Sequence, residues 1–329
     1  MFTLPLNAIE RAHERIRPYV RHTPLAPLPS LRGDLHPDLR LKLENLQVTG
    51  SFKPRGVFNT LVVLGAEGRV RGVVAASGGN HGVALAYAAH VMGVPATVYL
   101  PEMASADRVA RVERWGAHVV QVGRNWDDAH AAATAFAAEQ NLPYVHPFDA
   151  EPTLEGQGTL GLEILHDAPE TDCVLIAIGG GGLIGGAAAA LKAIKPSLRV
   201  IGVEPVGAPS MLRSVTAGEV VELSEVRTIA DTLAPRAVGP LVLALAQQHV
   251  DEIVLVSDAA MIEAMRWLWL ECNQLVEPSG AAVIAALMTG VARLEDSAHP
   301  VAVICGGNAS AGSVFTEYEQ AARARGSLD

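Results

Sequence analysis

Short apolar runs rich in β-branched residues alternate along the chain with alanine-rich segments of helical length. The runs that we expect to form strands are residues 72–76, 96–100, 118–122, 144–146, 174–178, 199–204, 252–256 and 301–304. Helical segments that we expect between these runs include residues 83–92, 106–115, 127–139 and 184–194. Because such alternation is typical of mainly parallel sheets covered by helices on both faces, the pattern predicts an α/β protein.

The first and last parts of the chain have weaker patterns. Asn7, followed three residues later by Glu10, resembles a capping box, so we expect a first helix to start there. A strand-like run at residues 41–44 and a helical run at residues 57–64 follow, and a last helical stretch is expected at residues 315–323. With 329 residues the chain is long enough for two domains.

Charge and cysteine content restrict the possible partners. The formal net charge of −10 argues against a nucleic-acid or anionic-membrane surface, because neither attracts an acidic protein. Three widely spaced cysteines without metal-ligand spacing are typical of a reducing compartment, which predicts a cytoplasmic location and no metal site. The first residues lack a charged segment followed by an apolar core, so we expect no secretory signal.

One uncharged run, residues 173–191, is long enough to qualify as a membrane span. Four consecutive glycines at residues 179–182 interrupt it, and glycine is a poor residue for a helix interior. We therefore expect a strand, a glycine turn and a helix here, and no membrane partner.

Lys53 is the first candidate for chemistry, and it lies in the segment SFKPRG at residues 51–56. Pro54 favours an extended backbone for Lys53 and suits the first position of a helix. A lysine amine can form a Schiff base with a carbonyl cofactor, and partial desolvation lowers its pKa enough for it to act as a base. On this segment alone, a surface lysine before a helix is the better interpretation, and the other motifs change that.

A second candidate segment, SGGNHG at residues 77–82, follows a predicted strand and opens a predicted helix. The backbone N–H groups and the helix dipole of such a turn attract a carboxylate or a phosphate, and Ser77, Asn80 and His81 add hydrogen-bond donors. A small-residue turn with an asparagine N-cap explains the segment equally well.

A third candidate is the glycine turn at residues 179–182, followed by Leu183. Glycines let a backbone approach a ligand closely, and successive N–H groups can bind a phosphate. Residues 180–185 also match the dinucleotide fingerprint, and Glu204 ends the next strand where a ribose-binding acid belongs. A nicotinamide-dependent oxidoreductase is therefore one alternative.

Two further residues are candidates because of where they fall in the pattern. Cys305 follows the predicted strand at residues 301–304, at the edge where ligands of open α/β sheets gather, although a buried inert cysteine is the alternative. Glu277, in VEPSG at residues 276–280, is either a carboxylate of the site or an acid at the start of a helix.

Several motifs occur together in one order. They are SFKxRG at 51–56, SxGNHG at 77–82, GQGT at 156–159, GGGGL at 179–183, VEPSG at 276–280 and CGGN at 305–308. The set resembles the fold-type II pyridoxal-phosphate enzymes, in particular the threonine/serine dehydratase and serine racemase family, over nearly the whole chain. The resemblance implies a tryptophan synthase β-like α/β fold. Its large cofactor-binding domain would span residues 1–71 and 150–329. Its small mobile domain would span residues 72–149 and would close over the substrate.

The resemblance also implies a role for each matching residue. Lys53 would bind pyridoxal 5'-phosphate covalently and then take the Cα proton of the substrate. The other residues implied in cofactor binding are Phe52, Asn80, Gly179, Gly180, Gly181, Gly182, Leu183, Glu277 and Cys305. Those implied in holding the substrate carboxylate are Ser77, Gly78, Asn80 and His81.

Cys305 matches the position that faces the pyridine nitrogen, where a neutral thiol would not keep that nitrogen protonated. The resulting milder electron sink favours prompt loss of a β-hydroxyl. The resemblance therefore leads to the hypothesis of a homodimeric lyase that dehydrates and deaminates a small β-hydroxy amino acid, L-threonine or L-serine first.

Four residues depart from the family pattern, and Pro54 is one of them. Gly78 stands where racemase-type members carry a second serine, which disfavours racemisation. Ser210 replaces the aspartate that pairs with Glu204 in the racemase-like metal site, so no metal is expected. Glu155 suggests a larger or more polar substrate, such as a hydroxyaspartate-like or phenylserine-like amino acid. A racemase and a β-replacement enzyme such as a cysteine synthase are the remaining alternatives.

Overall fold

The computed structural model describes residues 2–27, 35–68, 70–77 and 79–309, and it contains two separate sheets. The larger sheet has six strands in the order β1-β2-β9-β6-β7-β8, and the smaller has three in the order β3-β4-β5. All neighbouring strands are parallel except β1 and β2. The strands are β1 (Leu25–Pro27), β2 (Arg40–Lys42), β3 (Val73–Ala76), β4 (Ala96–Leu100), β5 (His118–Gln121), β6 (Cys173–Ala177), β7 (Arg199–Pro205), β8 (Glu252–Val256) and β9 (Pro300–Val303). The prediction of an α/β fold with mainly parallel sheets is confirmed.

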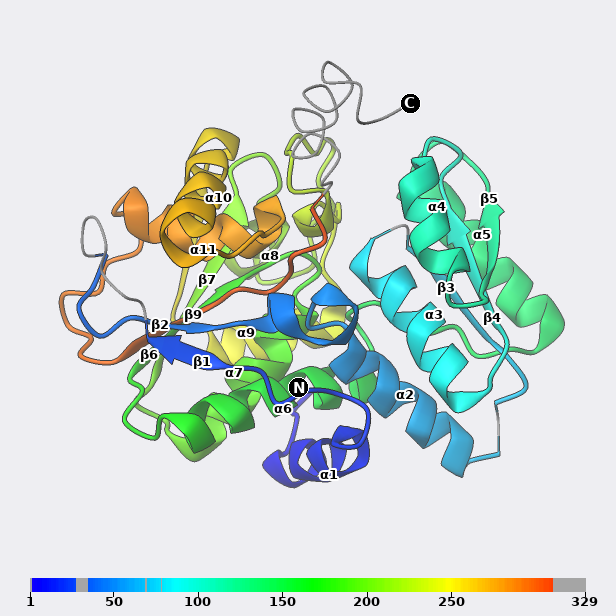
Figure 1. Cartoon of the computed structure of the whole chain (residues 1–329), viewed down its shortest axis with the longest axis horizontal. Coiled ribbons are helices and arrows are strands. Elements are labelled where there is room, and N and C mark those ends of the chain that lie inside the picture. The colour runs from blue at the N-terminus through cyan, green and yellow to red at the C-terminus, as the bar shows by residue number, and fades with distance from the viewer. Residues whose placement is uncertain (1, 28–34, 69, 78, 310–329) are drawn as a thin grey trace, which may run out of the picture.

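Helices cover both sheets (Figure 1). The α-helices are α1 (Leu6–Ile16), α2 (Pro54–Ala66), α3 (Asn80–Met92), α4 (Ala106–Glu113), α5 (Trp126–Gln140), α6 (Glu151–Asp167), α7 (Gly182–Ile194), α8 (Ser210–Ala217), α9 (Pro240–His249), α10 (Asp258–Cys272) and α11 (Pro278–Met288). Short 3₁₀ helices are η1 (Glu44–Leu46), η2 (Val48–Gly50) and η3 (Asp231–Leu233). Among these elements no helix is long and apolar enough to cross a bilayer.

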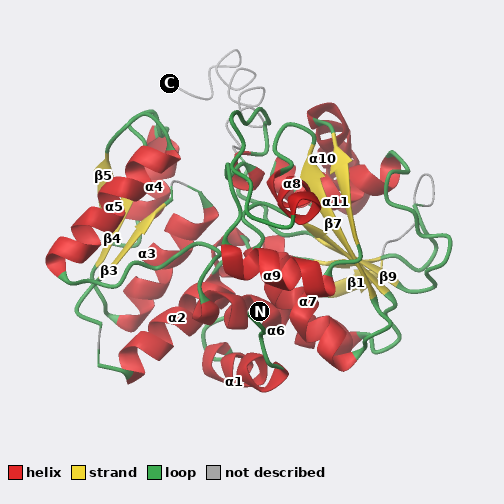
Figure 2. Ribbon diagram, turned by 180° about the vertical axis from the view of Figure 1, so that it is seen from behind, coloured by secondary structure: helices red, strands yellow, loops and turns green. Residues whose placement is uncertain are grey.

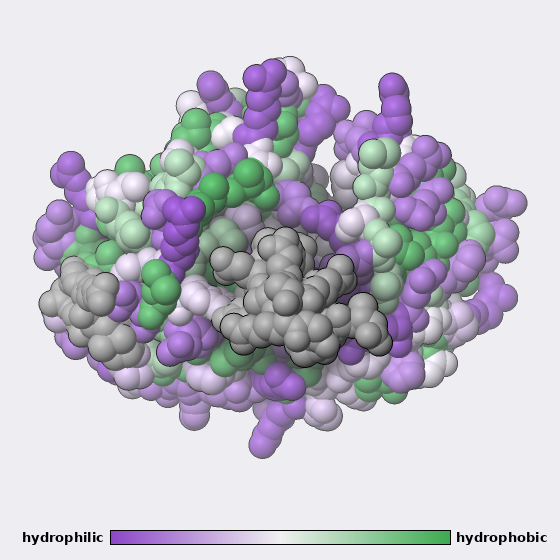
Figure 3. Space-filling model, turned by 45° about the horizontal axis from the view of Figure 1, so that its top comes forward, coloured by the Kyte–Doolittle hydropathy of each residue, from purple (hydrophilic) through white to green (hydrophobic). Residues whose placement is uncertain are grey.

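Each sheet lies in its own lobe of the molecule, as Figures 1 and 2 show from opposite sides. Strands β6 and β9 of the larger sheet are buried at every position, and so is β3 of the smaller one. Strands covered on both faces gain stability from apolar residues at every position, which explains why these segments are unbroken apolar runs. The space-filling view in Figure 3 shows a gap between the two lobes.

Several local expectations differ from the structure. The first helix starts at Leu6 after Pro5, which has no side-chain cap, so the predicted capping box at Asn7 is wrong. Residues 144–146 form only an isolated bridge, between Tyr144 and Val74, because the chain leaves the sheet there toward the other lobe. The short strand β1 was not predicted, and the expected helix at residues 315–323 lies outside the described residues.

Candidate active site

Strand order brings the predicted cofactor residues together. Strands β6 and β9 are parallel neighbours, so the glycine turn after β6 and Cys305 after β9 meet at the same edge of the larger sheet. Ser51 forms a bridge with Gly306, and the Phe52 amide donates to the Cys305 carbonyl at 3.2 Å. These contacts place Lys53 beside the same edge.

Lys53 begins the helical backbone instead of preceding it. Its φ of −55° and ψ of −35° lie in the α region, so the extended conformation expected from Pro54 is wrong, whereas Pro54 does occupy the first turn of α2. The Lys53 carbonyl already accepts from the Val57 amide at 3.2 Å. The steric preference imposed by proline is therefore outweighed by this helical bond and by the bridge at Ser51.

Among the described residues, the amine of Lys53 is hydrogen-bonded to a backbone carbonyl and to no carboxylate. Its Nζ donates to the Pro147 carbonyl at 2.8 Å and lies 4.9 Å from the centre of the Phe52 ring. Desolvation lowers the pKa of Lys53 to about 8, against smaller opposing effects from Cys305 and Glu277. At pH 7 roughly a tenth of such amines are uncharged, compared with fewer than about one in a thousand at the usual pKa. The site therefore prepares this lysine to act as a nucleophile and a base.

One cavity joins the residues predicted to bind the cofactor. All ten of them line a small cavity of about 40 Å³, together with five residues that the sequence did not single out. The predicted residues are Phe52, Lys53, Asn80, Gly179, Gly180, Gly181, Gly182, Leu183, Glu277 and Cys305. The additional ones are Phe148, Ala177, Thr232, Leu233 and Ser279.

The glycine turn is tightly packed as well as open to a ligand. A Cβ at Gly180 would lie 2.2 Å from the Phe148 ring, and one at Gly179 would lie 2.7 Å from the Thr232 carbonyl. Gly181 has a φ of +88°, which favours glycine, and it precedes the 13-residue helix α7 without a side-chain cap. The free N–H groups at this helix start are suited to a phosphate.

Cys305 is buried and is held as a neutral thiol. Its Sγ donates to the Ser279 carbonyl at 3.4 Å, and burial raises the pKa of Cys305 to about 12. The sulfur therefore carries no negative charge that would keep a neighbouring ring nitrogen protonated. This geometry suits the neutral role that the family resemblance implies.

Glu277 is a carboxylate of the cavity and not a helix cap. It occupies the N-cap position of α11, but its side chain makes no capping bond. Its Oε1 accepts from Asn80 Nδ2 at 2.5 Å and from Ser279 Oγ at 2.9 Å, while burial raises the pKa of Glu277. Asn308 Nδ2 in turn donates to Asn80 Oδ1 at 2.7 Å, so Asn80 is fixed at both ends of its amide. The alternative interpretation of Asn80 as an N-cap is wrong, because Gly79 holds that position.

The predicted substrate residues line a second, larger cavity. Ser77, Asn80, His81 and Lys53 lie on the wall of a cavity of about 430 Å³, whereas Gly78 lies outside the described residues. His81 is buried, and its Nε2 lies 2.9 Å from the Val145 carbonyl. Burial lowers the pKa of His81 to about 3, so the imidazole offers no positive charge to a carboxylate. The carboxylate must instead be held by neutral donors.

A buried ion cluster follows immediately after Lys53 in the chain. Arg55 donates from Nε to Glu44 at 2.8 Å and from Nη1 to Glu163 at 2.7 Å, and Lys42 Nζ lies 2.8 Å from Glu163. Burial alone would raise the pKa of Glu163, but Arg55 and Lys42 hold it at about 2. The cluster ties the first turn of α2 to α6, β2 and η1. It was not foreseen, because residues 108 positions apart form it.

Two other residues that the sequence singled out, Glu204 and Glu155, lie outside both cavities. Glu204 accepts from the Met211 and Leu212 amides at 2.8 and 2.9 Å at the start of α8, and burial raises its pKa to about 7. Glu155 instead pairs with Arg15 at 3.3 Å and with Asn59, so it does not contact a substrate in either cavity. In the described part of the chain, no group of three acidic, His or Cys side chains could hold a metal ion.

The family model described as pyridoxal-phosphate dependent enzyme matches residues 16–306. An L-threonine ammonia-lyase of Geobacter sulfurreducens is 38% identical over 98% of this chain and 80% of its own length. A serine racemase of Oryza sativa subsp. indica is 36% identical over 95% of this chain and 94% of its own. The solved structure of maize serine racemase has a TM-score of 0.94 at 32% identity, covering 99% of this chain and 100% of that one.

This chain belongs to the pyridoxal-phosphate dependent enzyme family, and its fold is that of the fold-type II members. Within that family it is a pyridoxal-phosphate-dependent ammonia-lyase of the threonine/serine dehydratase and serine racemase branch. The match overturns the nicotinamide alternative, and Glu204 confirms this because it caps α8 instead of facing the glycine turn.

Proposed function

We propose that this enzyme removes water from a β-hydroxy amino acid, L-threonine or L-serine first, and releases a 2-oxo acid and ammonia. The main observation behind the proposal is Lys53, whose amine has a lowered pKa and which lines both cavities. Relatives named L-threonine ammonia-lyase in Geobacter sulfurreducens and Thermotoga maritima support the substrate assignment.

The cavity residues fit pyridoxal phosphate by their chemistry. The start of α7 and its glycines offer N–H groups to the phosphate, and the Phe52 ring offers a face to the aromatic ring. Asn80 offers an amide, fixed by Glu277 and Asn308, to a ring substituent. When bound, the cofactor supplies an electron sink that weakens the bonds at the substrate Cα.

The residues of this chain perform the remaining tasks. Lys53 takes the proton from Cα, and its lowered pKa brings its basicity close to neutral pH. Ser77, Asn80 and the backbone of their turn orient the substrate carboxylate. The neutral thiol of Cys305 leaves the electron sink mild, which favours loss of the β-hydroxyl over a long-lived charge at Cα.

The two lobes support a division into a large domain, residues 1–71 and 150–329, and a small closing domain, residues 72–149. One buried core surrounds the larger sheet and another surrounds the smaller sheet, and Ile16 of α1 and Val57, Phe58 and Leu61 of α2 also belong to the second core. The larger cavity is lined from both lobes. A cytoplasmic location is supported by three free cysteines.

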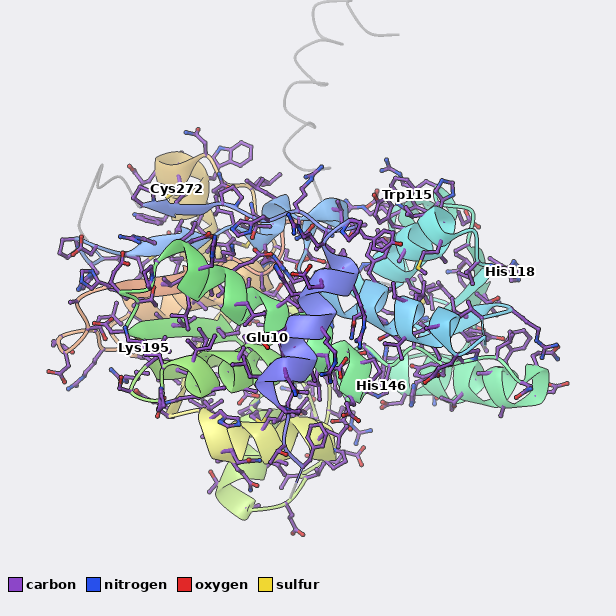
Figure 4. All side chains as sticks on the ribbon, turned by 90° about the horizontal axis from the view of Figure 1, so that it is seen from below. Glu10, Trp115, His118, His146, Lys195 and Cys272 are labelled. Carbon is purple, nitrogen blue, oxygen red and sulfur yellow. The ribbon has the colours of Figure 1, made fainter. Side chains whose placement is uncertain are left out.

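A homodimer is supported by an apolar face on α10. Ile262, Trp269 and Leu270 are 38%, 44% and 71% exposed, and their spacing of seven and eight residues places them on one face of the helix. Figure 4 labels Cys272 at the end of α10, on the side of the large lobe away from the small one. Light scattering is expected to give the mass of two chains, and Leu270→Glu is expected to shift it toward one.

The function is tested with the purified enzyme, pyridoxal phosphate and either L-threonine or L-serine. We expect 2-oxobutanoate or pyruvate in amounts equal to the ammonia released. Racemisation is the second candidate, because serine racemases are among the similar proteins. Chiral chromatography of unreacted serine distinguishes the two: D-serine formed faster than pyruvate would reject elimination as the main activity.

A further inference from the structure

The cavity that contains the substrate residues extends well beyond the space that serine or threonine needs. Its volume of about 430 Å³ lies in the range of pockets that enclose whole ligands. The wall away from the glycine turn is largely apolar. Pro101, Ala104, Trp126, Ala234 and Pro235 contribute to it, and Arg108, Asp127, Asp231 and Arg236 lie at its rim.

Trp126 presents a fixed surface to this cavity. Its Nε1 donates to the Ala76 carbonyl at 3.0 Å, and its ring stacks on His130 with centroids 4.8 Å apart and an interplanar angle of 9°. His130 is held in turn by Tyr144, 2.7 Å from its Nδ1. A side chain held on one face and at its polar atom loses little freedom when a ligand packs against its other face.

The charged residues at the rim neutralise one another across the gap between the lobes. Arg108 of α4 pairs with Asp231, and Arg236 pairs with Asp127 of α5 at 3.3 Å and with Glu222 at 3.0 Å. Figure 4 labels His146 in the segment that also connects the lobes. Exposed pairs of this kind add little stability, but they leave no unpaired arginine among the described residues of the wall.

We infer that this cavity holds the Cβ substituent of the substrate, and that β-hydroxy amino acids with a bulky apolar group on Cβ are preferred over L-threonine. The inference rests on the proposed function and names its substrate class. An acidic substituent is disfavoured because each rim arginine is paired and His81 is neutral. With L-threo-3-phenylserine, the Cα–H and Cβ–O bonds break, and water leaves and then returns during hydrolysis. The products are phenylpyruvate and one ammonium ion.

Binding is measured first, by titration calorimetry of the enzyme with amino acids that have no β-hydroxyl and cannot be eliminated. L-Phenylalanine is expected to bind at least tenfold more tightly than L-alanine, because even one buried methylene in an apolar pocket changes affinity about tenfold or more. L-Aspartate is expected to bind no more tightly than L-alanine. Equal affinity for L-phenylalanine and L-alanine would overturn the inference.

Turnover is measured next, as ammonia released from L-threonine, L-threo-3-phenylserine and L-threo-3-hydroxyaspartate. We expect kcat/KM for phenylserine to exceed that for threonine at least tenfold. Turnover of threonine with little turnover of phenylserine would reject the substrate class and keep the proposed function. Preference for hydroxyaspartate would also reject it. If no substrate releases ammonia, the proposed function fails, and the calorimetric comparison alone decides whether the cavity is an apolar site.

Two pairs of variants locate the effect. Ala104→Phe fills the cavity wall, whereas Ala106→Phe, two residues later, adds the same bulk outside the cavities. The ratio of kcat/KM for phenylserine over serine is expected to fall at least tenfold in the first variant and to stay unchanged in the second. Ala234→Phe and its control Ala237→Phe repeat the comparison at a second position in the cavity lining if Ala104→Phe does not fold. An unchanged ratio in both wall variants would overturn the inference.

Discussion

Two basic groups, one buried and one half-buried, lie two residues apart in the chain and have opposite surroundings. Arg55 is enclosed by Glu44 and Glu163, which raise its pKa above the usual value although burial alone would lower it. Lys53 is half-buried, its amine donates to a backbone carbonyl, and desolvation lowers its pKa to about 8. A fully compensated charge stabilises a structure, whereas an uncompensated one becomes reactive.

The largest expected effect tests the reactive member of this pair. Lys53→Ala is expected to reduce 2-oxo acid formation by at least about a thousandfold, because the variant lacks both the covalent attachment and the base. The rate is measured with saturating pyridoxal phosphate. Lys192→Ala, which removes a surface lysine paired with Asp251, is the control and should keep full activity. Activity in Lys53→Ala close to that of the control would refute the assigned role.

The compensated member is tested through stability. Arg55→Met leaves two buried carboxylates without their main partner, and we expect the free energy of unfolding to fall by about 3–5 kcal/mol. Urea denaturation followed by circular dichroism measures the change. Arg15→Met breaks a partly exposed pair with Glu155 and should lower stability by less than about 1 kcal/mol. Equal losses of unfolding free energy in the two variants would show that the buried ion cluster contributes no more to stability than the partly exposed pair.

The smallest expected effect is the pH dependence of the unfolding free energy that Lys53 causes in the protein without cofactor. The folded-state pKa of about 8 lies below the usual 10.5, so the unfolded chain binds more protons between these values. The free energy of unfolding should therefore rise with pH across this window. Below it, the full cost of desolvating the charged Lys53 amine should lower the stability. The difference in unfolding free energy between the wild type and Lys53→Met isolates this group. Parallel profiles for the two proteins would contradict the lowered pKa.

The sequence predicted the elements and motifs of the site better than their surroundings. The runs before the glycine turn and before Cys305 are unbroken and apolar, so their strands and the residues that follow them could be identified locally. The parallel pairing of β6 with β9 then brought the turn and Cys305 into one cavity, as the family resemblance implied.

Contacts between distant segments could not be predicted in this way. Phe148 packs against the glycine turn and lines both cavities, yet nothing in its own neighbourhood marks it. The partners of Arg55 and the neutral state of His81 likewise depend on segments brought together by folding. Pro54 indicated the wrong backbone for Lys53, because a preference of one dipeptide was weaker than the contacts on either side.

The packing of residues 146–149 has a consequence for how the enzyme can change. The Pro147 carbonyl receives the Lys53 amine, and the next residue, Phe148, rests against Gly180 and Gly182. One short stretch of backbone thus contacts both the Lys53 amine and the glycine turn proposed to bind the phosphate, and it helps to set the distance between them. An insertion or deletion there would move the contact to Lys53 and the contact to the glycine turn at the same time. We therefore expect changes of substrate specificity to arise from substitutions elsewhere in the lining of the larger cavity.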